Sequence, residues 1–514
     1  MRTVKTASGA VAVQIVHANR RGSREIEHIG SAHSPGEVEV LKTVARQRLH
    51  ANQDTLDFDD GQPGEQEAPI LTSQARHLWD TLSTAYRVLG LDRACPDEVF
   101  AQLVLARVIE PTSKLDAIRV LTDLGIAAPS YPTIKRRLPE YARPQWRQQL
   151  AGACADHVGL GPATLVLYDC STLYFEIDEG DGFREPGFSK ERRLEPQITV
   201  GLLTDVRGFP LQVHAFDGNT AETKTIIPVI RGFAAAHGLP QVTVVADAGM
   251  MSEANCKDLE DAGLAFIVAA KIPDVPYQVK QWQRDHPGQP IPDQHVFTQP
   301  TVMGPKTDPR RRTIYYQYRA DRARRSLKGI DTQIAKAEKA VAGKTAVKRN
   351  RFVQLTGATK TINRELEAKA RALAGLKGYV TNLAAPTPEF VLGAYHQLWQ
   401  IEKSFRMSKS DLRARPIYHH KRDSIEAHLT IVMAALAISR WLERQTGFSI
   451  KKIVQTLRPY RSIAVQTGNH ILHAGTPGTR SDRSGPDTPG PRQHGRPEFA
   501  VLTARLGIAH LQPA

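Results

Sequence analysis

The chain has 514 residues, of which 41% are hydrophobic and 24% are charged, proportions that exclude a chain disordered throughout. Its length predicts two or three domains. The 68 Lys and Arg residues outnumber the 53 Asp and Glu residues, and the resulting net charge of +15 favours a polyanionic partner, nucleic acid first, over a small neutral substrate.

The cysteine content and the hydropathy pattern indicate a compartment. The four cysteines are too far apart for a zinc knuckle and too few for a disulfide framework. The N-terminus lacks the apolar core and cleavage site of a secretory signal, and no run reaches the roughly 18 apolar residues of a membrane span. We therefore expect a soluble protein of the reducing cytoplasm with no membrane partner.

The first third of the chain predicts three segments. Residues 1–53 form a small N-terminal β module, because residues 10–30 alternate like a hairpin, and the acidic, polar residues 54–74 form a linker. Residues 75–158 carry helical patterns separated by Pro or Gly. Three of these short helices are compatible with a helix-turn-helix, and a plain helical packing domain is the alternative. The residues that would face a DNA groove are Thr133, Lys135, Arg136 and Arg137.

The middle of the chain predicts an α/β fold. Residues 159–275 give three sequential strands followed by alternating helices and strands, which implies a mixed sheet with an antiparallel edge and a parallel centre. This is the order of a ribonuclease-H-like catalytic core. We expect its second part, with a long helix from about Glu389 through Met407, in residues 378–465. Residues 466–514 are rich in Gly, Pro, Ser and Asp and are predicted to be largely disordered.

A basic segment lies between the two parts of this core, at residues 276–377. Residues 301–375 contain 19 Lys and Arg against 6 Asp and Glu, so most of the excess charge of the chain is concentrated here. The pattern indicates an insertion of long, exposed, basic helices. A solvated hairpin without a ligand is one interpretation. We prefer a surface that contacts the phosphate backbone, because unpaired cations at this density repel one another unless an anion is present.

Two apolar runs of the expected core each close on a carboxylate, Asp169 in LVLYD and Asp247 in VTVVAD. Ligands cluster at strand ends in open α/β sheets, and two neighbouring carboxylates repel each other, so a shared cation is the simplest way to satisfy both. Hard oxygen ligands select Mg²⁺ or Mn²⁺. A single Asp at a strand end is common in other folds, so this interpretation needs a third element.

The third element is a helical stripe in YHQLWQIEKSFRMSKSDLRARPI. Five residues of this segment recur at spacings that place them on one face of a single helix. A mostly apolar stripe thus presents a Glu and, two turns later, a Lys. The alternative is an amphipathic core helix in which Glu402 pairs with Arg406. The five residues are Tyr395, Leu398, Glu402, Phe405 and Lys409.

These features resemble bacterial insertion-sequence DDE transposases, the family with a Tyr-Arg-Glu-Lys signature on its catalytic helix. The chain is also similar to one subgroup of that family in YDCSTLYFE, VGLLTDVRGFPLQVHAFDGNTAETKT, VVADAGMMSEAN and RPIYHHKRDSIEAHL. The similarity spans roughly residues 90–445. It departs from the signature at Leu398, which stands where the family has Arg, so the phosphate contact of that Arg would fall to Arg406 or Lys403.

The resemblance implies a catalytic triad of Asp169, Asp247 and Glu402 that holds two Mg²⁺ or Mn²⁺ ions. It also implies cleavage at insertion-sequence ends and transfer of the 3′-OH into target DNA, with Tyr395 and Lys409 holding phosphates beside the scissile bond. The implied partners are double-stranded DNA, as terminal inverted repeats and target, and a second copy of the chain in the DNA complex. The implied location is the bacterial cytoplasm, at the nucleoid.

Two other functions compete with this interpretation. A catalytically inactive DNA-binding protein derived from a transposase would keep the fold and the basic helices, and Leu398 at the signature Arg position favours it. An aspartyl-phosphate phosphatase would also place an Asp at a strand end. It requires a second Asp two residues after Asp169, where the chain has Ser171.

Overall fold

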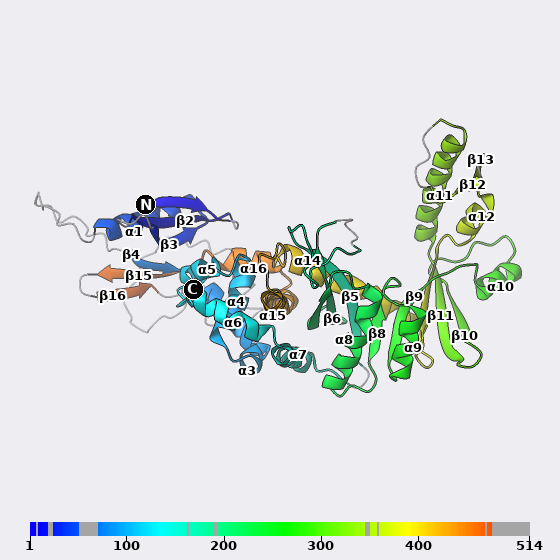
Figure 1. The fold of residues 1–514 in the computed structure, drawn as a ribbon, viewed down its shortest axis with the longest axis horizontal. Coiled ribbons are helices and arrows are strands. Elements are labelled where there is room, and N and C mark those ends of the chain that lie inside the picture. Colours follow the sequence, from blue (N-terminus) through cyan, green and yellow to red (C-terminus); the bar gives the residue numbers. More distant parts are fainter. Residues whose placement is uncertain are drawn as a thin grey trace, which may run out of the picture.

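The molecule is elongated, with a small β module at one end, a large sheet in the middle and a projecting arm at the other end (Figure 1). We describe it from a computed structural model. The residues that the structure describes are 1–6, 9–18, 24–50, 70–161, 164–188, 194–344, 350–356, 359–467 and 470–474.

The N-terminal module is a three-stranded antiparallel sheet in the order β1-β2-β3. A helix that was not predicted from the sequence packs against strands β2 and β3. The module's elements are β1 (Arg2–Lys5), β2 (Val11–Ala18), β3 (Arg24–Ala32) and α1 (Pro35–His50).

A second small sheet joins segments that the sequence analysis assigned to the linker and the tail. Within the expected linker, β4 (Ile70–Gln74) pairs with β15 (Ser462–Thr467), which in turn pairs with β16 (His470–Ala474). Residues 54–69 of the expected linker and residues 475–514 of the expected tail lie outside the described residues. Strands that pair across almost 400 residues leave no local periodicity between them, so sequence patterning could not find this sheet.

Residues 75–158 form helices α2 to α7, and α15 (Arg422–Thr446) packs against α2, α4, α6 and α7. Among the described residues, α15 alone is long and apolar enough to span a membrane, but 89% of its apolar window is buried inside the protein, as in the core helix of a soluble domain. The other helices here are α2 (Arg76–Val88), α3 (Leu91–Ala94), α4 (Glu98–Ile109), α5 (Ala117–Asp123), α6 (Tyr131–Tyr141), α7 (Pro144–Val158) and α16 (Ile450–Leu457).

The central sheet has eight strands in the order β10-β11-β14-β9-β8-β5-β6-β7. Strands β5, β8 and β9 run parallel, and the others pair antiparallel. The five strands from β5 to β9 lie in the spatial order β7-β6-β5-β8-β9, which is the ribonuclease-H-like order predicted from the sequence. The strands are β5 (Leu165–Tyr174), β6 (Gln197–Asp205), β7 (Pro210–Asp217), β8 (Thr243–Ala246), β9 (Ala265–Ala270), β10 (Val296–Met303), β11 (Arg310–Tyr318) and β14 (Leu376–Thr381).

Alternate residues of the sheet face two different cores. Val166 and Val244 face the core beneath α8 (Glu222–Ala236) and α9 (Glu253–Asp261), whereas Leu167 and Val245 face the core shared with α13, α14 and α15. This alternation follows from the two-residue period of a strand. The second face carries the candidate active site, and its helices are α13 (Pro388–His396) and α14 (Leu398–Ser410).

The basic insertion expected at residues 276–377 is partly sheet. Strands β10, β11 and β14 extend the central sheet beyond β9, so only the segment between β11 and β14 projects as an arm (Figure 1). The sequence did not predict β11 because the strand begins with a run of basic residues. One of them, Arg312, is almost fully buried and pairs with Glu253 and Glu260 of α9. The other elements are α10 (Tyr277–Asp285), α11 (Ala320–Val341), β12 (Val353–Thr356), β13 (Thr359–Ile362) and α12 (Arg364–Ala372).

Candidate active site

The two aspartates occupy matching positions on neighbouring parallel strands. Strand β5 pairs with β8 in the register Leu165↔Thr243 to Leu167↔Val245, and Asp169 and Asp247 each lie two residues beyond the last pair. Neighbouring strands are about 4.8 Å apart, and residues two apart point to the same face, so both aspartates belong to the face beneath α13 and α14. Asp247 follows the end of β8 as predicted, whereas β5 continues past Asp169 to Tyr174, held by its pairing with β6.

The predicted long helix is divided at Gln397. Helix α13 begins at Thr387, whose hydroxyl accepts a hydrogen bond from the Phe390 N–H, and ends at His396. Gln397 N donates to Ala394 O at 3.1 Å, and Gln400 N donates to Gln397 O at 2.8 Å, so three-residue turns replace the α-helical bonds at this point. Tyr395 therefore lies on a different helix from the other four residues of the predicted stripe.

Tyr395 contacts Asp247 directly. Its hydroxyl donates to Asp247 Oδ1 at 2.8 Å, and the same oxygen accepts from Ala248 N at 2.8 Å. Burial, followed by the hydrogen bond and charge of Asp247 and by the charge of Glu402, raises the pKa of Tyr395. The phenol therefore stays protonated at neutral pH and orients the carboxylate, with Oδ2 of Asp247 left for another ligand.

Glu402 lies on the exposed side of α14, near enough to Tyr395 for its charge to act on the phenol. In the described parts of the chain its side chain makes no hydrogen bond or ion pair, so the pair with Arg406 that the alternative interpretation required is not formed. Helix α14 packs against β5, the strand that carries Asp169. The three carboxylates thus come from β5, the end of β8 and a helix that lies over them.

The donor atoms of this site suit a hard cation, but they do not form a complete coordination site. Carboxylate oxygens are the ligands that Mg²⁺ and Mn²⁺ prefer. Within the described ranges, no group of three or more His, Cys, Asp or Glu side chains is placed to hold a metal ion. The carboxylates therefore fit the ion by chemistry, and their side chains would have to converge to coordinate it.

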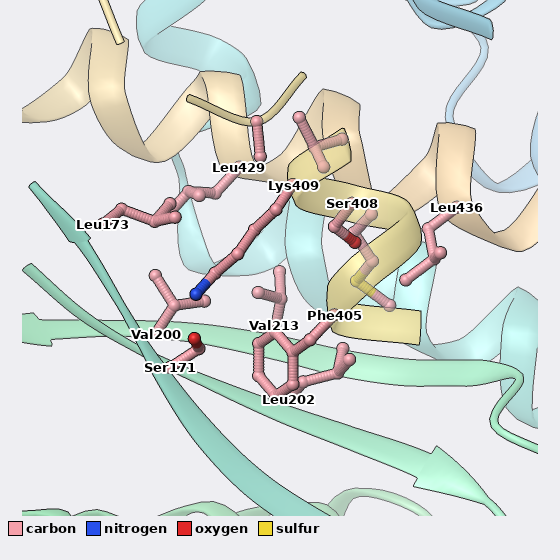
Figure 2. Close-up of a pocket in the computed structure, with 13 residues that line it drawn as sticks. Ser171, Leu173, Val200, Leu202, Val213, Phe405, Ser408, Lys409, Leu429 and Leu436 are labelled. Atoms are coloured by element: carbon pink, nitrogen blue, oxygen red, sulfur yellow. The ribbon is translucent and has the colours of Figure 1, made fainter. Parts of the chain in front are cut away.

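Lys409 points toward the sheet. Figure 2 shows its side chain extending from α14 across a small apolar cavity of about 30 Å³ to Ser171 and Val200. Ser171 is two residues beyond Asp169 on the same face of β5. Lys409 is half-buried, and its ammonium group lies near Ser171, on the face of β5 that also carries Asp169.

The cations suggested as substitutes for the signature Arg differ in availability. Lys403 Nζ forms an ion pair with Glu443 of α15 at 2.9 Å and is therefore already engaged. Arg406 is exposed and has no side-chain partner among the described residues. Leu398 packs against the apolar core.

The three basic residues predicted to face DNA lie on the exposed side of α6, which begins at the capping residue Ser130. Arg137 pairs with Asp97 at 3.5 Å, and Lys135 lies over the Tyr131 ring at 4.8 Å. Arg136 has no partner in the part of the chain that is described. These exposed side chains are accessible to a ligand. No contact within the described residues shows which ligand it is.

One residue near the site was missed by the sequence analysis. Lys377 of β14 lies 4.4 Å from the centre of the Tyr395 ring and 5.5 Å from the centre of the Tyr379 ring. The expected second part of the core began at residue 378, so Lys377 fell at the end of the expected basic segment. The alternation of Lys377 and Tyr379 was the signal that they share a face.

Comparison with known proteins identifies one sequence family. The family described as "Transposase DDE domain" matches residues 170–438, a range that begins one residue after Asp169 and includes Asp247 and Glu402. No curated protein matches the chain in sequence.

Two solved transposase complexes are similar in structure. One is a piggyBac transposase synaptic complex with hairpin DNA, with 10% identity over 75% of this chain and 69% of that chain and a TM-score of 0.36. The other is a Mos1 transposase paired-end complex with the left transposon end, with 14% identity over 44% of this chain and 66% of that chain and a TM-score of 0.15. At such low scores neither adds to the fold assignment, which rests on the strand order.

Proposed function

Because the chain belongs to the transposase DDE domain family, we propose that it cuts DNA at the ends of its own element and joins the freed 3′-OH to target DNA. The family match covers more than half of the chain. The observation that supports this most is the matching position of Asp169 and Asp247 on adjacent parallel strands, with Tyr395 bonded to Asp247 and Glu402 above them.

The proposed chemistry assigns a role to each of these side chains. Asp169, Asp247 and Glu402 hold two Mg²⁺ or Mn²⁺ ions, which when bound supply the Lewis acidity for an in-line phosphoryl transfer. Tyr395 fixes the orientation of Asp247 through its hydroxyl. Lys409 adds positive charge beside β5, where the phosphates next to the scissile bond would lie.

The proposed substrate is double-stranded DNA, as terminal inverted repeats and as target. Two basic surfaces support it: the exposed side of α6, with Lys135, Arg136 and Arg137, and the outer side of the α11 arm. In the arm, the buried stripe of Ile330 and Ile334 packs inward, which leaves cationic side chains on the solvent side. Joining two ends requires two active sites, so we propose a homodimer in the DNA complex, located at the bacterial nucleoid.

The decisive experiment compares wild type with Glu402→Gln on a duplex that carries the element's terminal repeat. We expect the variant to bind this DNA normally but to lose Mg²⁺-dependent nicking by about 100-fold or more, because a neutral amide is a poor ligand for the ion. Glu389→Gln, an exposed glutamate on α13, is the matched control and should cleave normally. Equal cleavage by wild type and Glu402→Gln would reject the site.

The second candidate is a transposase-derived DNA-binding protein without chemistry. Leu398 at the signature Arg position and the open arrangement of the carboxylates favour it. It predicts that wild type binds the terminal repeat but cleaves it with neither Mg²⁺ nor Mn²⁺. The same assay therefore separates the two functions.

A further inference from the structure

A lysine from the neighbouring strand lies against the predicted catalytic residues. Lys377 Nζ lies over the face of the Tyr395 ring, and the hydroxyl of that ring donates to Asp247. Tyr379, on the same face of β14, packs edge-on against Tyr395 with 4.9 Å between the ring centres. The ammonium group is thus placed near enough to Asp247 for the two charges to interact.

Lys377 is half-buried and forms no ion pair with any carboxylate in the described residues. Burial and the charge of Arg322 lower the pKa of Lys377, whereas the charge of Asp247 raises it. A cation with little water and no ion-paired carboxylate is stabilised further by an anion that enters the site.

Two further groups around Lys377 are suited to the same anion. Arg322, in the first turn of α11, donates to Gln317 O and Gly375 O at 3.3 Å each, which holds the guanidinium at the root of the arm. The Tyr379 hydroxyl is fully buried, and the charge of Arg322 and a hydrogen bond from it offset part of the rise in pKa that burial causes. Arg322 and Lys377 thus place two cations around the Tyr379 ring.

We propose that Lys377 contacts the DNA phosphate next to the cleaved bond, and so replaces the arginine that Leu398 displaced from the signature helix. The inference rests on the proposed transposase function. It explains how the chain keeps a cation at the site although position 398 is apolar. The alternative is that Lys377 only packs on the two tyrosine rings.

Rescue by a second substitution separates these roles. Lys377→Met keeps most of the apolar stem over Tyr395 but removes the charge, and we expect it to cleave terminal-repeat DNA about tenfold to a hundredfold more slowly. Adding Leu398→Arg to this variant should restore most of the rate, because the charge then enters from α14. Lys280→Met, an exposed lysine on α10, is the control and should cleave normally. Normal cleavage by Lys377→Met, or no rescue by Leu398→Arg, would overturn the proposal.

A binding measurement tests the contact without cleavage. Wild type and Lys377→Met are titrated, in the presence of EDTA, with two duplexes that differ only in a neutral methylphosphonate at the phosphate beside the cleavage position. We expect the neutral linkage to weaken wild-type binding about tenfold and to have less than about a twofold effect on the variant. If the neutral linkage weakens DNA binding equally in both proteins, the contact is refuted, whatever the cleavage assay shows. If wild type gives the expected binding result but does not cleave, only the proposed catalysis is refuted.

Discussion

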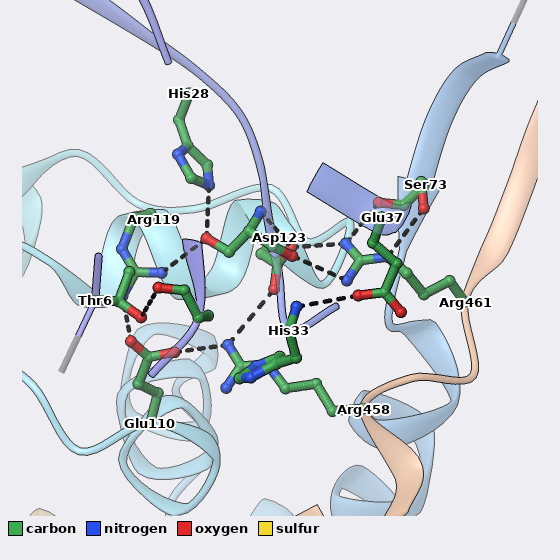
Figure 3. A network of polar contacts seen from close by, with 12 residues as sticks. Thr6, His28, His33, Glu37, Ser73, Glu110, Arg119, Asp123, Arg458 and Arg461 are labelled. Atoms are coloured by element: carbon green, nitrogen blue, oxygen red, sulfur yellow. Dashed lines mark hydrogen bonds and ion pairs between the residues drawn. The ribbon is translucent and has the colours of Figure 1, made fainter. Parts of the chain in front are cut away.

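Two groups of buried cations lie around the end of α4, and they are balanced in opposite ways. In the first, which we call the paired network, Arg119, Arg458 and Arg461 meet Glu110 and Asp123 (Figure 3). Arg458 Nη2 lies 2.6 Å from Glu110 Oε2, and Arg461 Nη2 lies 2.8 Å from Asp123 Oδ1. Each carboxylate thus serves two arginines.

The second group, which we call the unpaired cluster, begins one turn earlier on α4 and has no acid. Lys114 Nζ lies 2.8 Å from His428 Nδ1, and Arg107 donates to Arg413 O at 3.5 Å. Carbonyl Ala414 O accepts from His428 Nε2 at 3.0 Å, so Nδ1 is the acceptor for Lys114. No ion pair is formed by these three side chains within the described residues.

The two groups differ in the direction in which their surroundings shift the pKa values of the buried side chains. In the paired network, burial acts to raise the pKa of Asp123, but Arg461 and Arg458 outweigh it and hold the pKa below its usual value. In the unpaired cluster, burial lowers the pKa of Arg107 to about 10 and moves those of Lys114 and His428 well below their usual values. The network, which also bonds to Ser31 of the N-terminal module, therefore holds full charges, whereas burial in the cluster favours the neutral forms of Lys114 and His428.

The largest effect should follow from breaking the network. Asp123→Ala leaves Arg458 and Arg461 buried without their shared carboxylate, and we expect the free energy of unfolding to fall by about 3–5 kcal/mol. Urea unfolding followed by circular dichroism measures it. Asp80→Ala removes an exposed ion pair with Arg76 and should cost less than about 1 kcal/mol. Similar losses in the two variants would show that the network contributes no more than a surface pair.

The order of the core strands and the aspartate pair could be predicted from the sequence because their signals are local. Each strand reads as an apolar run, and the 78 residues between Asp169 and Asp247 equal the offset of the β5–β8 register. The paired network could not be predicted in this way. Ser31, Asp123 and Arg461 come from three distant segments, and nothing in their neighbours' periodicity shows that they meet.

The candidate site was predicted in part for the same reason. Tyr395 and Glu402 were found from helical spacing. The turn at Gln397 depends on backbone hydrogen bonds, which the spacing of residue types does not reveal. Lys377 was missed because it lies on a strand next to β9, and its contact with Tyr395 requires the sheet to place β14 beside α13. Contacts between elements, unlike the elements themselves, require the tertiary fold.

A pH-dependent effect on stability should come from Lys114, the lysine of the unpaired cluster. The pKa of Lys114 is lower in the folded protein than its ordinary 10.5, so between these values the unfolded chain binds the extra proton and wild-type stability rises with pH. Lys114→Met lacks this titration. We expect its stability relative to wild type to be highest near about pH 7 and to decline by up to about 1.4 kcal/mol per pH unit toward about pH 10. Unfolding curves of the two proteins that stay parallel across this range would contradict the assignment.

The smallest effect on stability should come from replacing His428, and it should appear at acidic pH. Its folded pKa is below the ordinary 6.5, so the unfolded chain binds the proton first and wild-type stability is lost as the pH falls below about 6.5. Gln can accept from Lys114 and donate to Ala414 O without titrating, so His428→Gln should lose about 1–2 kcal/mol less than wild type between about pH 7 and about pH 5. His419, whose pKa burial lowers to about 4, is present in both proteins and cancels in the difference. Equal losses would mean that His428 keeps its proton despite its burial beside Lys114 and Arg107.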